Sequence, residues 1–278
     1  MTGTGRPIQE SPRTARFRAL HASGCFVMPN PWDPGTARLL VQLGFPAVAT
    51  TSAGAAWSLG RPDNGVDLET MLAHLTTMAG AVDVPVNADF EGGFAVTPDG
   101  VAAHVTHACA TGVAGLSIED ATGDPHAPLF DRALAVERVQ AAREAIDRSR
   151  TGVMLTARSE GFIVGRPDLD ETVARLTAYA AAGADCVYAP GLTDHAVIAS
   201  VVRAVAPVPV NLLVNGPFIT VAEAAACGVR RISVGGALAR TAWAAVLAAA
   251  GEIARDGTFG ALAQGAPSAD LNRRFDRA

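Results

Sequence analysis

Short apolar runs recur along the chain at regular spacing and alternate with segments of helical periodicity. Eight such runs are found, and they are too continuously apolar for strands that expose one face to water. They are typical of parallel strands buried on both faces. The runs comprise residues 25–29, 47–52, 84–89, 115–120, 153–158, 186–190, 208–213 and 231–235.

The intervening segments carry the start and stop signals of helices. Thr97-Pro98-Asp99 precedes a helical pattern that reaches Cys109, and Thr220 with Glu223 matches a capping box. Strands alternating with helices in this way predict an α/β fold, a (β/α)8 TIM-type barrel. An open doubly wound sheet is the alternative, although no G-x-G-x-x-G follows the first run. We expect a flexible N-terminal tail over residues 1–15 and a single barrel domain over residues 16–278.

Composition and charge exclude several classes of protein. The 278 residues carry a net charge of −5 without a basic stripe, so we expect no nucleic-acid partner. Residues 1–24 lack the apolar core of a signal peptide, and no apolar run approaches membrane-spanning length. The Ala-rich segment 241–250 is expected to be a buried helix. The four cysteines form no C-x-x-C, so neither a disulfide framework nor a zinc site is predicted, and a cytoplasmic location is expected.

The chain contains no lysine. Schiff-base catalysis requires an amine nucleophile. A Lys-dependent aldolase, a pyridoxal enzyme and a Walker-type phosphate loop are therefore excluded. Carbanion chemistry in this protein would require a metal ion instead.

Oxygen-bearing side chains occupy alternate positions at the end of the third run. Asn87, Asp89 and Glu91 are two residues apart, and such side chains on a strand point the same way. Three oxygen ligands directed at one point suit a hard cation such as Mg²⁺. The alternative is a polar strand end that leads into a glycine turn.

Chemistry in such barrels lies at the C-terminal ends of the strands. This rule places Glu119 of the fourth run and Arg158 of the fifth beside Asp89. A metal next to a carboxylate-binding Arg suits an α-oxo acid. The metal would polarise the oxo group, and the Arg would bind the carboxylate through two hydrogen bonds. The alternative is that Arg158 only forms ion pairs with Glu119 or Glu160 at the barrel mouth. The rule also selects Asn30, Asp33, Asp120, Tyr188, Asn211, Asn215 and Gly235–Gly236.

Five motifs, in this order, resemble the isocitrate lyase/phosphoenolpyruvate mutase superfamily across roughly residues 25–245. They are PNPWDPGTARLL, TTSAGAAWSLGRPD, VNADFEGGF, GLSIED and LTARSEG. The resemblance implies a Mg²⁺-dependent barrel, with Mn²⁺ as a possible substitute, that makes or breaks C–C or P–C bonds beside an enolpyruvate-like fragment. It also implies a homotetramer, a dimer of dimers, in which C-terminal helices are exchanged between subunits.

The resemblance also implies roles for individual residues. The metal would be held by Asp89, Asn87, Glu119 and Glu91, with Asn87 in place of the usual Asp. Arg158, Asp63 and Glu119 would be catalytic, Arg158 by binding the substrate carboxylate. The loop Ser52-Ala53-Gly54 would receive the same carboxylate, and Asn211 is a further candidate substrate contact.

A further departure from the family pattern lies in the gating loop after the fourth run. The lyases carry a Cys there, whereas this loop reads Asp120-Ala-Thr-Gly-Asp-Pro-His126, so the chain is a divergent member. We expect a lyase that breaks a C–C bond in a small α-oxo or 2-hydroxy (di)carboxylate, such as an oxaloacetate-like or methylisocitrate-like acid, through a metal-stabilised enolate. The alternatives are P–C chemistry, as in a phosphonopyruvate hydrolase or the mutase, and a non-catalytic oxo-acid-binding barrel. His126 is a candidate proton donor in this loop.

Overall fold

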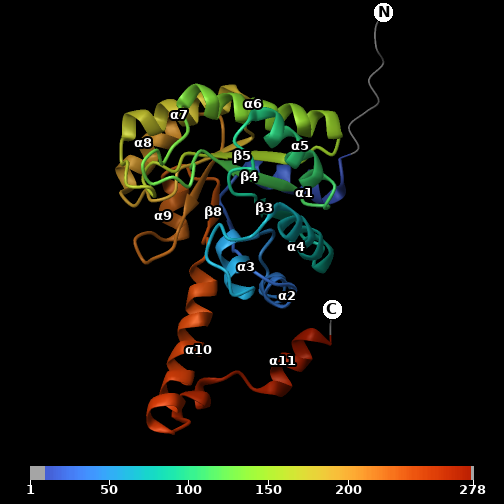
Figure 1. Ribbon diagram of the computed structural model, residues 1–278, viewed down its shortest axis with the longest axis vertical. Coiled ribbons are helices and arrows are strands. Elements are labelled where there is room, and N and C mark those ends of the chain that lie inside the picture. The colour runs from blue at the N-terminus through green and yellow to red at the C-terminus, as the bar shows by residue number, and fades with distance from the viewer. Residues whose placement is uncertain (1–9, 277–278) are drawn as a thin grey trace, which may run out of the picture.

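The computed structural model describes residues 10–276 and contains an eight-stranded parallel barrel surrounded by helices (Figure 1). The neighbouring strands follow the order β1-β8-β7-β6-β5-β4-β3-β2, which confirms the predicted (β/α)8 fold. The strands are β1 Phe26–Met28, β2 Val48–Ala49, β3 Val86–Asp89, β4 Gly115–Glu119, β5 Met154–Arg158, β6 Cys186–Tyr188, β7 Val210–Leu213 and β8 Arg231–Ser233.

The barrel is joined between β1 and β2 by contacts just beyond the strand ends. The Ala49 N–H donates to the Pro29 carbonyl at 3.0 Å. The side chain of Asn30 donates to the Thr50 carbonyl at 2.8 Å and accepts two backbone N–H groups that follow β8, each at 2.9 Å. Asn30 is therefore a structural residue that ties β1, β2 and β8 together.

The helices begin where capping residues permit. Asp33, Thr97 and Thr220 each accept a first-turn N–H, and Asp33 and Thr220 form complete capping boxes. This confirms the predicted caps at Thr97 and Thr220 and gives Asp33 a structural role. The helices of the barrel are α1 Pro12–Ala22, α2 Pro34–Gln42, α3 Ser52–Ser58, α4 Leu68–Ala81, α5 Pro98–Cys109, α6 Arg132–Ser149, α7 Leu169–Ala181, α8 His195–Val205 and α9 Val221–Ala226.

Helix α1 lies partly within the segment expected to be a tail. It begins at Pro12, with Ser11 as its cap, and buries Thr14, Phe17 and His21. The predicted boundary at residue 15 is therefore wrong, because aromatic packing holds this helix to the barrel. Residues 1–9 lie outside the described residues. Phe17 packs with Phe26 and other apolar residues in a cluster that closes the N-terminal end of the barrel.

The main core lies between the strands and the surrounding helices. Leu75, Phe90, Leu116, Ile146 and Leu155 are fully buried in it. Burial of such side chains is the main driving force for folding, with about 1.5–3 kcal/mol for each. The core therefore fixes the strand ends on which the polar residues stand.

The C-terminal arm departs from the barrel. It consists of α10 Ala237–Asp256, the 3₁₀ turn η1 Gly260–Gln264 and α11 Ser268–Phe275. Figure 1 shows α10 extending away from the barrel and α11 returning toward α2, where the side chain of Gln42 donates to the Arg274 carbonyl at 2.6 Å.

The expectation of a buried helix over residues 241–250 is wrong for the single chain. Only Ala239 of α10 is buried, and Leu247 is 70% exposed. By length and composition alone, α10 is also the one helix of residues 10–276 that could cross a membrane. The expected absence of a membrane partner and the expected exchange of C-terminal helices both stay predictions.

Candidate active site

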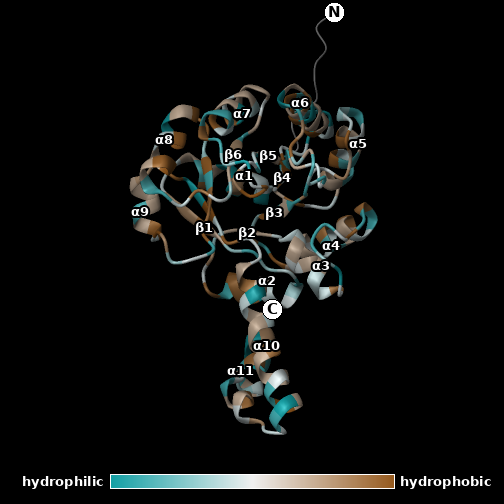
Figure 2. Ribbon diagram, turned by 60° about the vertical axis from the view of Figure 1, so that its left-hand side comes forward, coloured by the Kyte–Doolittle hydropathy of each residue, from teal (hydrophilic) through white to brown (hydrophobic). Residues whose placement is uncertain are grey.

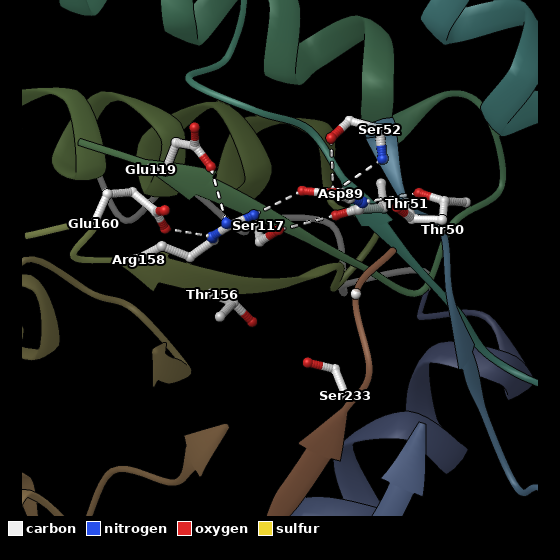
Figure 3. Close-up of polar contacts among 12 residues, drawn as sticks. Thr50, Thr51, Ser52, Asp89, Ser117, Glu119, Thr156, Arg158, Glu160 and Ser233 are labelled. Atoms are coloured by element: carbon white, nitrogen blue, oxygen red, sulfur yellow. Dashed lines mark hydrogen bonds and ion pairs between the residues drawn. The ribbon is translucent and has the colours of Figure 1, made fainter. Parts of the chain in front are cut away.

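Asp89 stands at the C-terminal end of β3 and is held by donors from two sides. One carboxylate oxygen accepts the backbone N–H of Ser52 at 3.0 Å and its hydroxyl at 2.9 Å. The other accepts from Arg158 at 2.8 Å, and the Asp89 N–H donates to the Thr50 hydroxyl. Figure 3 shows these groups meeting at one end of the barrel. The start of α3 thus fixes the orientation of the carboxylate.

Arg158, at the end of β5, lies among three carboxylates. Its nitrogens lie 2.8 Å from Asp89, 3.1 Å from Glu119 and 2.9 Å from Glu160 (Figure 3). The register pairs Arg158 with Glu119 on β4 and with Tyr188 on β6, and the Tyr188 ring centre lies 5.0 Å from the guanidinium carbon. The structure therefore brings together the three central residues of the predicted site, and it also shows the ion pairs of the alternative interpretation.

The site has a surplus of negative charge. Burial raises the pKa of the Glu119 and Glu160 carboxyls, although the cation of Arg158 opposes this shift. Burial, together with the carboxylates of Asp89 and Asp63, raises the pKa of Glu91 to about 7. Burial and the Asp89 carboxylate also raise the pKa of Asp63. One guanidinium does not neutralise this set of carboxylates, so a divalent cation would stabilise its ionised form.

The donor set fits a hard cation held largely through water. Within residues 10–276, no three His, Cys, Asp or Glu side chains form a ready-made cage for a metal. Mg²⁺ usually retains several waters and takes one or two carboxylates. Asp63, Glu91, Glu119 and Arg158 line one open cavity, and Asp89 lines the adjoining one. These oxygen donors therefore suit Mg²⁺ better than a soft metal.

Asn87 lies deeper in the barrel than Asp89. It is 3% exposed, and its amide nitrogen donates to the Ala88 carbonyl at 3.2 Å. Its side-chain oxygen has no hydrogen-bond partner among residues 10–276 and lies beside Gly115, where an added Cβ would come within 2.7 Å of it. Its predicted role as a metal ligand is therefore less direct than that of Asp89.

The predicted carboxylate loop is partly occupied by the protein itself. The N–H of Ser52 binds Asp89, and that of Gly54 donates to the Thr51 hydroxyl at 3.2 Å. The N–H of Ala53, in the first turn of α3, has no acceptor in the described part of the chain, as is usual at helix N-termini. Ala53 also lines the inner cavity. It is the member of this loop that is free to bind an anion.

Asn211 lines the same inner cavity but is engaged by neighbouring side chains. Its amide donates to the Ser233 hydroxyl at 2.9 Å and accepts from Arg231 at 2.8 Å. Three further polar residues of this region, Arg231, Thr156 and Ser233, are not among the predicted site residues. Thr156 and Ser233 do leave a signal in the sequence, because polar residues at inward positions of otherwise apolar strands point into the barrel.

The loop after β4 is folded back on itself. The Phe130 N–H donates to the Asp120 carbonyl at 2.9 Å, and Ala121 and Leu129 form an isolated bridge. His126 is exposed and lines a separate cavity on the outer side of this loop. In this conformation it does not face Arg158, and its predicted role as a proton donor would require the loop to move.

The inner cavity measures about 190 Å³ and extends from Asp89 and Arg158 down to Arg231. Most sites for drug-sized ligands measure about 300–1,000 Å³. The inner cavity therefore suits a small acid.

Comparisons with known proteins agree with this geometry. Residues 17–254 match the family model of phosphoenolpyruvate phosphomutase. An uncharacterised protein of Mycobacterium tuberculosis is 32% identical over 262 residues, which cover 93% of this chain and 95% of that protein. Other relatives are named 2-methylisocitrate lyase in Escherichia coli and oxaloacetate decarboxylase in Paraburkholderia xenovorans.

Solved structures show the same fold. One from Burkholderia cenocepacia J2315, provisionally assigned as a lyase/mutase, is 50% identical with a TM-score of 0.91 and covers 95% of each chain. Oxaloacetate acetylhydrolase in complex with its product oxalate is 28% identical with a TM-score of 0.83, covering 97% of this chain and 95% of that chain. The chain belongs to the phosphoenolpyruvate mutase/isocitrate lyase superfamily.

Proposed function

We propose that the protein is a Mg²⁺-dependent carbon–carbon lyase that acts on a small α-oxo or 2-hydroxy dicarboxylate of the oxaloacetate type. The observation that carries the proposal is the convergence of Asp89, Glu119 and Glu160 on Arg158 at the C-terminal end of the barrel. The small inner cavity and the relatives named for oxaloacetate chemistry support it.

Arg158 would bind the carboxylate next to the oxo group. Its guanidinium now contacts three carboxylates, and burial raises the pKa of two of them, Glu119 and Glu160. Binding of Glu119 to a cation would free a guanidinium N–H group for the substrate. Because the Tyr188 ring packs beside Arg158, the guanidinium would keep its position when the substrate carboxylate replaces a protein carboxylate.

Asp89, Glu119 and Glu91 would hold the metal together with water. A bound Mg²⁺ would supply Lewis-acid polarisation of the substrate oxo group. Ser52 orients the Asp89 carboxylate through two hydrogen bonds, so the side chain does not need to reorganise when a ligand binds. Such preorganised electrostatics is commonly the largest single contribution to catalysis.

A panel of oxo acids and hydroxy acids tests the proposal. With Mg²⁺ present, we expect release of pyruvate, glyoxylate or oxalate from at least one C4–C7 dicarboxylate. Arg158→Met should lower kcat/KM by roughly 100-fold or more, the scale seen when one preorganised donor is removed. Arg148→Met is the matched control, because Arg148 lies exposed on α6 and, within residues 10–276, forms an ion pair only with Glu144. Equal rates for the parent and Arg158→Met would refute the role of Arg158.

P–C bond chemistry is the second candidate. The family model named for the phosphomutase and a phosphoenolpyruvate phosphomutase structure among the neighbours favour it. Release of phosphate from phosphonopyruvate, without cleavage of any C–C substrate, would establish this alternative. Oxalate binding without turnover of any compound would instead indicate a non-catalytic binding protein.

The oligomeric state belongs to the same proposal. We propose that α10 packs against a second copy in a homotetramer, because its apolar side chains are otherwise exposed to water. Trp243 is 40% exposed and Val246 55%, and Trp243 and Leu247 line an apolar groove with Trp57. Figure 2 shows apolar residues along this projecting helix. Light scattering should give four times the chain mass, and a monomeric mass would refute the arrangement. We also propose a cytoplasmic location.

A further inference from the structure

Arg231 is a buried cation that has no carboxylate partner in the described part of the chain. It is 2% exposed, and its side chain lies inside the barrel at the start of β8. Its three contacts are the Asn211 side-chain oxygen at 2.8 Å, the Thr156 hydroxyl at 3.0 Å and the His21 ring at 3.3 Å. Within residues 10–276, no Asp or Glu oxygen lies within ion-pair distance of it. A buried charge that is not neutralised is costly, so this arrangement calls for a compensating anion.

His21 does not compensate the charge. Its Nδ1 lies 2.8 Å from the Phe17 carbonyl, so Nδ1 carries the proton and Nε2 accepts from Arg231. Burial and the Arg231 cation lower its pKa to about 3, and the ring is therefore neutral. All three acceptors around the guanidinium are neutral. They use three of its five N–H donors and leave two without an acceptor in the described chain.

Arg231 lines the same cavity as Asp89 and Arg158. Inside the barrel, polar side chains stand two residues before the site residues of the same strands, so both sets point inward. Of these, Ser117 lines the cavity, and Thr156 contacts Arg231. Thr156 precedes Arg158, Ser117 precedes Glu119, and each step corresponds to roughly 6.6 Å along the strand. Figure 3 shows the hydroxyls of Thr156 and Ser233 directed into the interior below Arg158. A small acid held at Arg158 can therefore extend its far end toward Arg231.

We infer that Arg231 is the binding site for the second carboxylate of the substrate. The inference rests on the proposed function and identifies the residue that would bind the far carboxylate of the dicarboxylate. Arg158 would bind the end that reacts, and Arg231 the far carboxylate through its two remaining N–H groups. Asn211, Thr156 and His21 hold the guanidinium in place. Monocarboxylates of similar length would leave the buried charge without a partner and bind more weakly.

A matched pair of ligands tests this assignment. Malate and 2-hydroxybutyrate have the same number of carbons and the same 2-hydroxy acid end, and differ in a carboxylate or a methyl group at the far end. Calorimetry with Mg²⁺ should show that the parent protein binds malate roughly 10- to 100-fold more tightly, as expected for one charge-assisted contact. Arg231→Met should remove this preference and leave oxalate binding unchanged, because oxalate does not reach the cavity floor.

Other results would overturn the inference. One such result is a parent protein that binds oxalate but binds malate no more tightly than 2-hydroxybutyrate. Another is an Arg231→Met variant that keeps the preference for malate over 2-hydroxybutyrate. Either result would show that Arg231 only stabilises the barrel. The proposed function would survive both results. If oxalate and all oxo acids fail to bind the parent, the proposed function and the inference fail together.

A second measurement is independent of whether the variant folds. Crystals of the parent grown with Mg²⁺ and malate should show a ligand carboxylate within hydrogen-bond distance of the Arg231 guanidinium. Density that places the far carboxylate toward solvent would overturn the assignment.

Discussion

The neutral His21 under the barrel floor makes stability depend on pH in a defined way. Its folded-state pKa of about 3 lies far below the ordinary value of 6.5, because the ring is buried and faces Arg231. The unfolded chain therefore binds a proton between pH 6.5 and 3 that the folded chain does not bind. Stability is lost as pH falls through this window. The linkage relation gives a loss of about 2 kcal/mol between pH 7 and pH 5 from this residue alone.

The perturbation that isolates this effect is His21→Gln. A glutamine amide can accept from Arg231 but does not titrate, so the variant should lack the His21 contribution to pH dependence. It also loses the edge-to-face contacts of the ring with Phe17 and Phe26, which lowers stability at every pH. The informative quantity is therefore the change between pH 7 and pH 5, and not the absolute free energy of unfolding.

Urea unfolding monitored by circular dichroism measures this quantity. The parent should lose about 2 kcal/mol more than His21→Gln between the two pH values. Titration of the His21 ring by NMR provides a direct check and should show a neutral ring at pH 5. Equal losses for the two proteins, or a ring that protonates near pH 6, would refute the neutral contact with Arg231.

Three further predictions concern the site, the helix packing and the assembly. Gly54→Ala should lower the free energy of unfolding by about 1–3 kcal/mol, because the new Cβ would lie 2.7 Å from Thr51 and 2.9 Å from Trp32. Urea unfolding measures this loss, with Gly80→Ala as the control because a Cβ at Gly80 would meet open space. Arg158→Lys should recover little of the activity lost in Arg158→Met, because an ammonium cannot replace the planar guanidinium with its two parallel N–H donors. Steady-state kinetics measures the recovery, and full activity of Arg158→Lys would contradict this prediction. Leu247→Asp should convert the assembly to smaller species in light scattering, whereas an unchanged mass would mean that α10 lies outside the subunit interface.

The fold was predictable because parallel strands leave a simple signature. Runs such as residues 115–120 and 153–158 match β4 and β5 within one residue at each end. Position along a strand then identifies the site, since the carboxyl ends of parallel strands meet at one end of the barrel. Asp89, Glu119 and Arg158 were located by that rule, and the Glu119–Arg158 ion pair follows from the register of the adjacent strands β4 and β5. The Asp89–Arg158 ion pair spans β4, because Asp89 stands on β3 and Arg158 on β5.

Other features depend on tertiary contacts that no local pattern reports. Arg231 follows Arg230 at the start of a strand, and only the inward direction of its side chain places it in the cavity floor. Ser52 was expected to bind substrate, but its N–H and hydroxyl orient Asp89. The Ala-rich helix α10 is apolar enough for a buried position, yet the single chain provides no surface that covers it. The apolar composition of α10 predicts that the helix is covered by another surface, but it does not identify that surface.

The most direct test of the account is a crystal structure of the protein with Mn²⁺ and oxalate. Mn²⁺ replaces Mg²⁺ at oxygen-rich sites and can be located by its anomalous scattering. We predict a single strong anomalous peak beside the Asp89 carboxylate, with oxalate between this peak and the Arg158 guanidinium. A peak elsewhere in the molecule, or oxalate bound away from Arg158, would contradict it.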